Sequence, residues 1–128
     1  MVHILMVEDD ENSRLIVRDL LERVAACHLI EAVSGPGGVG AAEAHQPDLI
    51  LMDVQLPGFD GLEAARRIQA NPLLRHIPII AVTSYAMRDD ERRAREAGCQ
   101  GYLSKPFDPT ALLEMIQRFL PSVGRCCD

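Results

Sequence analysis

Residues 48–53 read DLILMD, an apolar run of strand length that ends at the carboxylate of Asp53. A run that is apolar at nearly every position is typical of a strand covered on both faces, as in a parallel sheet with helices on either side. A second apolar run, residues 3–7, ends in the same way, at Glu8-Asp9-Asp10. We therefore expect buried parallel strands whose carboxyl ends carry acidic side chains.

Outward from these runs, the sequence alternates between strand-like and helix-like segments. The strand-like segments are residues 3–7, 29–33, 48–52, 77–82 and 101–103, and helix patterns cover residues 12–24, 39–45, 62–70, 88–97 and 109–120. Five strands that alternate with five helices predict a doubly wound α/β fold, with helices on both faces of a parallel sheet. Such five-stranded sheets commonly have the flavodoxin-like order 2-1-3-4-5, which places a ligand-binding crevice at the carboxyl ends of strands 1 and 3.

Two of the helices carry specific expectations. In the first, one face gathers five apolar side chains and should be buried: Ile16, Val17, Leu20, Leu21 and Val24. At the start of the second, residues 35–40 contain four glycines and a proline. Glycine and proline disfavour helix interiors, so we expect this helix to be short and to begin only near Val39.

The composition limits domain number and function. With 128 residues the chain has room for one domain, which we place at residues 1–121, followed by a disordered tail at residues 122–128. Its net charge of -6 argues against a general nucleic-acid-binding protein, which needs a basic face. No apolar stretch approaches the ~18 residues of a membrane span, and the acidic N-terminus lacks the basic region of a signal peptide. We expect a cytoplasmic protein that binds neither nucleic acid nor membrane.

Polar residues that suit phosphoryl chemistry gather at the predicted carboxyl edge of the sheet. Glu8 and Asp9 follow strand 1, Asp53 follows strand 3, and Thr83 and Lys105 follow strands 4 and 5. Three close carboxylates repel one another unless a cation compensates, and oxygen-only ligands favour a hard ion such as Mg²⁺. A metal ion, an ammonium group and a hydroxyl can together hold the oxygens of a phosphoryl group. Asp53, on the central strand, is then the best-placed nucleophile for forming an aspartyl phosphate.

Each of these residues taken alone has an ordinary structural explanation. An acidic segment such as residues 8–11 is favoured at a helix N-terminus by the helix dipole. Asp53 could cap a turn, Lys105 could face solvent, and Thr83 could cap the next helix. Their common position at one edge of the sheet favours a phosphoryl site over these separate roles.

The same segments resemble the receiver domain of two-component response regulators. The resemblance covers nearly all of residues 2–120 and is carried by residues 4–10 (ILMVEDD), 48–53 (DLILMD), 56–61 (LPGFDG), 81–83 (AVT) and 101–107 (GYLSKPF). It implies the flavodoxin-like (βα)5 receiver fold. Among single-domain members, the sequence looks closest to the cell-cycle regulators of the DivK type.

The resemblance also implies a role for each site residue. Asp53 is the expected phosphoacceptor, Lys105 pairs with the phosphoryl group, and Thr83 is the switch hydroxyl that moves toward it. Tyr102 is the expected aromatic switch, which turns inward when Thr83 moves. The expected metal is Mg²⁺, for which Mn²⁺ can substitute, and its ligands are Asp9, Asp53, the backbone carbonyl of Gln55 and, mainly through water, Glu8.

The implied function is a phosphorylation switch in a phosphorelay. Such a protein is not an enzyme toward other substrates, because it catalyses only its own phosphorylation and dephosphorylation. The implied phosphoryl donor is a histidine kinase or a histidine phosphotransfer protein. An unknown downstream protein would bind the face formed by the fourth helix, fifth strand and fifth helix, or would receive the phosphoryl group. We expect a monomer or a weak dimer.

Two other interpretations remain open on the sequence alone. The chain could be a receiver excised from a hybrid histidine kinase or a larger regulator. It could also be a metal-dependent phosphatase of similar fold. Those enzymes use a second catalytic aspartate two residues after the nucleophile, where this sequence has Gln55, so the phosphatase is the weaker alternative.

Overall fold

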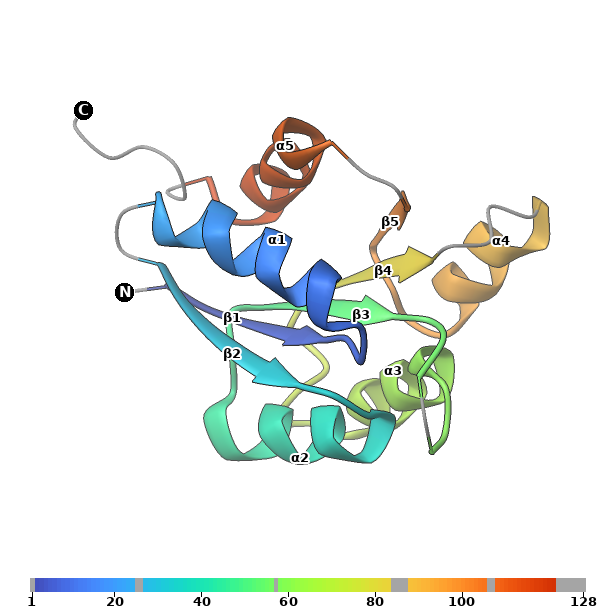
Figure 1. The fold of residues 1–128 in the computed structure, drawn as a ribbon. Helices are drawn as coiled ribbons and strands as arrows, with labels where there is room; N and C mark the ends of the chain where they lie inside the picture. The colour runs from blue at the N-terminus through green and yellow to red at the C-terminus, as the bar shows by residue number, and fades with distance from the viewer. Residues whose placement is uncertain (1, 25–26, 57, 84–87, 106–107, 122–128) are drawn as a thin grey trace.

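The computed structural model describes residues 2–24, 27–56, 58–83, 88–105 and 108–121, drawn as a ribbon in Figure 1. The segment predicted to be a disordered tail, residues 122–128, lies outside the described residues. Within the described ranges, strands and helices alternate along the whole chain, as the sequence pattern predicts.

The five strands form one parallel sheet in the order β2-β1-β3-β4-β5, which confirms the predicted topology. Both β3 and β4, in the middle of the sheet, are buried at every residue, as expected for strands covered on both faces. The strands are β1 (Val2–Val7), β2 (Cys27–Ala32), β3 (Leu49–Asp53), β4 (Ile79–Thr83) and β5 (Gly101–Ser104).

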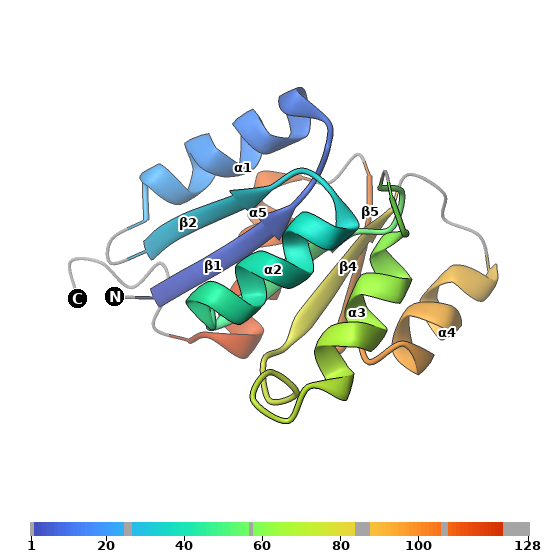
Figure 2. The ribbon, with the colours of Figure 1, turned by 90° about the horizontal axis from the view of Figure 1, so that it is seen from below.

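The helices form two layers, with α1 and α5 on one face of the sheet and α2, α3 and α4 on the other (Figures 1 and 2). Successive residues of β1 point to alternate layers, so that Ile4 packs with α1 and α5, and Leu5 packs with α2 and α3. The helices are α1 (Glu11–Glu22), α2 (Gly35–His45), α3 (Gly61–Ala70), α4 (Arg88–Glu96) and α5 (Pro109–Phe119).

The buried face of α1 differs in one position from the prediction. Val17 and Leu21 of α1, and Val24 just after its end, are buried against the sheet, and Leu20 is half-buried. Ile16, which was predicted to share this face, is 50% exposed, as is its neighbour Leu15 at 46%. The reason is geometric: adjacent helix residues lie about 100° apart, and the stripe that meets the sheet is centred on Val17 and Leu21.

The prediction that the second helix begins near Val39 is wrong, because α2 begins at Gly35. Ser34 caps it by accepting a hydrogen bond of 3.0 Å from the backbone N–H of Gly37. The glycines serve close packing. A Cβ at Gly35 would overlap the backbone oxygen of Phe59, and a Cβ at Gly38 would lie 2.7 Å from a methyl group of Val7. Helix propensity accounts for the cost of glycine in a helix but does not include these tertiary contacts.

Two alanine substitutions separate these effects. Gly40 has open space around the position of a Cβ, so Gly40→Ala should stabilise the protein by about 0.5–1 kcal/mol through helix propensity alone. Gly35→Ala should destabilise it, because the new methyl group must displace the chain at Phe59. Chemical denaturation of the two variants measures both effects. Equal stabilisation by both substitutions would show that the start of α2 is not packed as described.

The strand register brings the predicted site residues to one edge of the sheet. Val7 pairs with Met52, Asp53 with Val82, and Thr83 with Ser104. The residues that end or directly follow these four strands therefore lie side by side at the carboxyl edge.

Candidate functional site

Three carboxylates meet at this edge. Glu8 and Asp9 follow β1, and Asp53 is the last residue of β3. One carboxylate oxygen from each lies within 4.8 Å of the others. Glu8 and Asp53 are each only 4% exposed, whereas Asp9 is exposed. Carboxylate oxygens at this spacing are a donor set that suits a hard divalent cation such as Mg²⁺.

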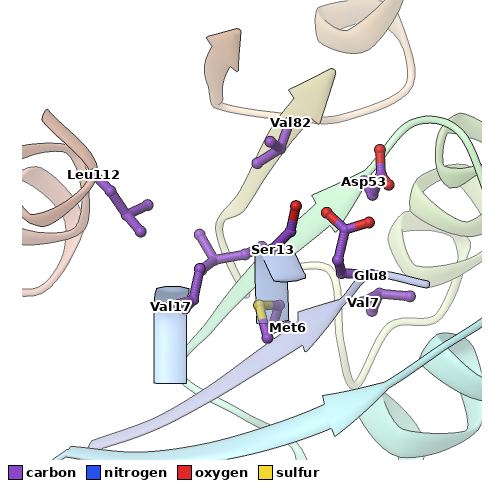
Figure 3. Close-up of a pocket in the computed structure, with 9 residues that line it drawn as sticks. Met6, Val7, Glu8, Ser13, Val17, Asp53, Val82 and Leu112 are labelled. Carbon is purple, nitrogen blue, oxygen red and sulfur yellow. The ribbon is translucent and has the colours of Figure 1, made fainter. Parts of the chain in front are cut away.

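The floor of the site is apolar, as Figure 3 shows for the side chains beneath Glu8 and Asp53. A cavity of about 10 Å³ lies there, which is room for no more than one water molecule. The two carboxylates thus have little solvent below them. Apart from these two residues, the cavity is lined by Met6, Val7, Ser13, Val17, Leu51, Val82 and Leu112.

Lys105 places a positive charge among the carboxylates. Its Nζ forms an ion pair with Glu8 and lies 3.5 Å from Oδ2 of Asp53. The backbone N–H of Lys105 donates a hydrogen bond of 2.7 Å to the carbonyl of Thr83, which fixes the start of this segment beside β4. The ammonium group therefore acts as the counter-ion of the cluster and faces the same space as the carboxylates.

Burial and mutual repulsion set the protonation of the pair. Burial is the largest cause that raises the pKa of Asp53, to about 7, and the hydrogen bond and charge of Glu8 add to it. Burial also acts to raise the pKa of Glu8, but hydrogen bonds with Asp53 and Lys105 outweigh it and lower that pKa. The pKa of Lys105 is raised by both carboxylates in spite of its burial. Asp53 therefore keeps its proton to a higher pH than an ordinary aspartate does.

This proton makes cation binding dependent on pH. A divalent cation must displace it. As the pH rises toward about 7, the dissociation constant for Mg²⁺ should therefore fall by about tenfold per pH unit, and above about 7 it should stay constant. Calorimetric titration in two buffers of different ionisation enthalpy measures both the affinity and the protons released. Equal Mg²⁺ affinity at about pH 6 and about pH 8 would contradict the raised pKa of Asp53.

Gln55 and Thr83 lie next to Asp53 and to each other. The backbone N–H of Gln55 donates to Oδ1 of Asp53 at 3.1 Å, and its side-chain Nε2 lies 3.1 Å from Oγ1 of Thr83. Thr83 is completely buried. Tyr102, which pairs with Ala81 on the neighbouring strand, is half-buried and packs against the core on the side of α2 and α3, with its hydroxyl oxygen buried.

Two residues that the sequence analysis did not single out help to shape the site. A Cβ on Gly61, the first residue of α3, would overlap the carbonyl group of Asp53, so only glycine allows this close approach. Arg14 of α1 donates a hydrogen bond of 3.1 Å to the backbone carbonyl of Glu8. Its guanidinium group lies 3.5 Å from Glu31 of β2, which also pairs with Arg18 at 2.7 Å. Helix periodicity marks Arg14 only as polar, because Glu31 is brought beside it by the tertiary fold.

Arg14 should therefore support cation binding without touching the cation. Arg14→Met should weaken Mg²⁺ binding by about tenfold, because the backbone that carries Glu8 and Asp9 loses its tether. The substitution also removes a positive charge near the cation. Glu31 already neutralises much of that charge in the wild type, so its loss changes the electrostatics of the site less than the formal charge suggests. Arg23→Met is the control: Arg23 pairs with Asp19 on the exposed surface of α1 and should leave the affinity unchanged. An unchanged Mg²⁺ affinity in both variants would show that Arg14 does not support cation binding.

Comparison with known proteins identifies the family. Residues 4–117 match the model of the response regulator receiver domain. The chain is also similar to the polar-differentiation response regulator DivK of Brucella ovis, with 43% identity over 117 residues that cover 91% of this chain and 94% of the relative. None of the helices in the described part of the chain has the length and apolar character that a membrane crossing needs.

Solved structures give the same family. The receiver domain of a sensor histidine kinase from Pseudomonas aeruginosa, with a magnesium ion coordinated in its active-site cleft, is 34% identical with a TM-score of 0.86, covering 94% of this chain and 98% of that one. The chemotaxis response regulator CheY4 of Vibrio cholerae is 27% identical with a TM-score of 0.86, covering 93% and 98%. The chain therefore belongs to the response regulator receiver domain family.

Proposed function

We propose that this protein is a phosphorylation switch in which Asp53 accepts a phosphoryl group from a phosphohistidine. The donor is a histidine kinase or a histidine phosphotransfer protein. The observation that carries the proposal is the position of Asp53, which ends the central strand within reach of Lys105 and two further carboxylates. The similarity to the response regulator DivK supports a role in signalling, and the proposed output is partner binding or onward phosphotransfer.

In the transfer step, a carboxylate oxygen of Asp53 forms a bond to phosphorus. The bond from phosphorus to the donor nitrogen breaks, and its electron pair returns to the imidazole ring. Lys105, whose ammonium group lies beside Oδ2 of Asp53, pairs with an oxygen of the arriving group. The hydroxyl of Thr83 donates to another oxygen once it has moved toward Asp53.

The residues present fit a divalent metal. Asp9, Asp53 and the backbone carbonyl of Gln55 would hold Mg²⁺ directly, and Glu8 mainly through water. The fit rests on three carboxylate oxygens within 4.8 Å and on an oxygen-only donor set, for which Mn²⁺ can substitute. The metal supplies positive charge that neutralises the phosphoryl oxygens. The magnesium site of the Pseudomonas receiver supports this assignment.

Phosphorylation then changes a distant surface. Movement of the Thr83 hydroxyl would draw Tyr102 inward from its half-buried position on β5 and alter the face formed by α4, β5 and α5, where a downstream protein would bind. We place this receiver domain at residues 1–121 and expect it to act as a monomer or a weak dimer.

The donor would dock beside Asp53. Three apolar side chains, those of Leu15, Ile16 and Val33, are 46–52% exposed, and they lie on α1 and at the end of β2 near the carboxyl edge of the sheet. Exposed apolar side chains beside a polar site are typical of a docking surface. We propose that the donor protein covers them when its phosphohistidine reaches Asp53.

Incubation with acetyl phosphate and Mg²⁺ tests the proposed function. Intact-protein mass spectrometry should show the addition of one phosphoryl group, and EDTA should prevent it. Borohydride reduces an aspartyl phosphate to homoserine, so peptide mapping after reduction should find homoserine at position 53. Label on another residue, or steady hydrolysis of p-nitrophenyl phosphate without a phosphorylated protein, would contradict the proposal.

A further inference from the structure

The side chain of Gln55 is joined to the proposed switch hydroxyl. Its Nε2 lies 3.1 Å from Oγ1 of Thr83, and in the reverse sense Oγ1 lies 3.4 Å from Oε1 of Gln55. A hydroxyl both donates and accepts, so the contact holds for either orientation of the amide. Through its backbone N–H the same residue also donates to Oδ1 of Asp53.

The burial of Thr83 makes this contact consequential. The residue is completely buried, and a buried hydroxyl that gives up a hydrogen bond must gain another to avoid a loss of stability. In the proposed mechanism the Thr83 hydroxyl leaves its resting position and binds a phosphoryl oxygen. It must then exchange the amide of Gln55 for the phosphoryl group.

We propose that the Gln55 side chain is a positioning residue that holds the Thr83 hydroxyl in its resting place and so opposes activation. This inference rests on the proposed function and deepens it. In the proposed switch this bond breaks when the Thr83 hydroxyl moves, so the bond shifts the equilibrium toward the resting arrangement and reduces the apparent affinity for any ligand that needs the active one.

The inference makes a signed prediction. Gln55→Met keeps the length of the side chain but removes both hydrogen-bonding atoms. The variant should bind beryllofluoride, which attaches to an aspartate carboxylate as a phosphoryl mimic, about 2- to 10-fold more tightly than the wild type. If Gln55 acts through Thr83, the same substitution should have no effect in a Thr83→Val background, where the hydroxyl is absent.

The experiment is a double-mutant cycle on the full chain. Beryllofluoride is titrated in the presence of Mg²⁺ into the wild type, Gln55→Met, Thr83→Val and the double variant, and binding is followed by NMR. The methyl resonance of Thr83 gives a second readout: in Gln55→Met without ligand, it should shift toward its position in the activated wild type. Gln69→Met is the matched control, because Gln69 is also half-buried and its amide donates to a distant carbonyl, that of Gly98.

The outcomes are distinguishable. No beryllofluoride binding by the wild type overturns the proposed function itself. Binding by the wild type with equal or weaker binding by Gln55→Met overturns only the restraint on Thr83. Equal tightening with and without the Thr83→Val substitution would mean that Gln55 acts without the hydroxyl, which also overturns it. Gln55→Ala serves as a second variant if Gln55→Met melts at a much lower temperature than the wild type.

Discussion

In the Asp53→Asn variant, acetyl phosphate and Mg²⁺ should leave no phosphoryl group on the chain, whereas the wild type gains one. An amide oxygen is neutral and is a poor nucleophile toward phosphorus, so the loss should be complete. Intact-protein mass spectrometry over a time course measures it. Asp48→Asn is the matched control, because Asp48 directly precedes the same strand at its opposite end and accepts a hydrogen bond from the backbone of His3. Asp48→Asn should be labelled at the wild-type rate.

The same variant reports on the electrostatics of the cluster. The pKa of Asp53 is higher in the folded protein than the ordinary value of 3.8, so this carboxyl costs stability that grows as the pH rises above 3.8 and reaches its full value above about 7. In EDTA at about pH 8, Asp53→Asn should therefore melt at a higher temperature than the wild type. Rapid labelling of Asp53→Asn would place the phosphoacceptor elsewhere. A lower melting temperature of this variant would contradict the expected repulsion between Asp53 and Glu8.

Lys105→Ala should separate cation binding from phosphoryl binding. The ammonium group pairs with Glu8 and Asp53, and Mg²⁺ would compete with it for the same carboxylates. Mg²⁺ affinity should therefore be retained or increased. Labelling by acetyl phosphate should slow by about 100-fold, because an oxygen of the transferred group loses its cation, and the structural response to beryllofluoride should be lost.

Titration calorimetry and a labelling time course measure the two effects of Lys105→Ala on one preparation. Lys105 is the only lysine of the chain, so the variant removes a charge that no other lysine can replace. Labelling and a beryllofluoride response equal to those of the wild type would show that this ammonium group does not contact the phosphoryl group. Loss of Mg²⁺ binding would instead make Lys105 a support of the metal site.

Most of the fold was predictable because strand and helix patterns alternate without interruption. The meeting of Glu8, Asp9 and Asp53 was predictable for a related reason, since parallel strands in a known order bring their carboxyl ends together. The start of α2 was not, because its glycines fit against Phe59 and Val7, which lie far away in the sequence.

Contacts between side chains from different elements were also beyond the sequence. Nothing in the order of residues indicates that Glu31 reaches Arg14 or that the amide of Gln55 reaches Thr83. The first contact depends on how α1 lies against β2, and the second depends on how the segment after β3 lies beside β4. Sequence patterns identify which residues line the edge of the sheet, and the structure adds which of them touch.

The packing of α2 against the connection after β3 determines where the chain can tolerate a change in length. Gly35 lies against the backbone of Phe59, and a Cβ on Gly58 would lie 2.9 Å from the ring of Pro36, so each segment fits into the other. An insertion in either segment would move the start of α2 away from the connection after β3 and would displace Asp53. The connection from α3 to β4, which carries the 66% exposed Leu73, lies at the opposite edge of the sheet. A reporter domain that must leave Asp53 undisturbed is best inserted there.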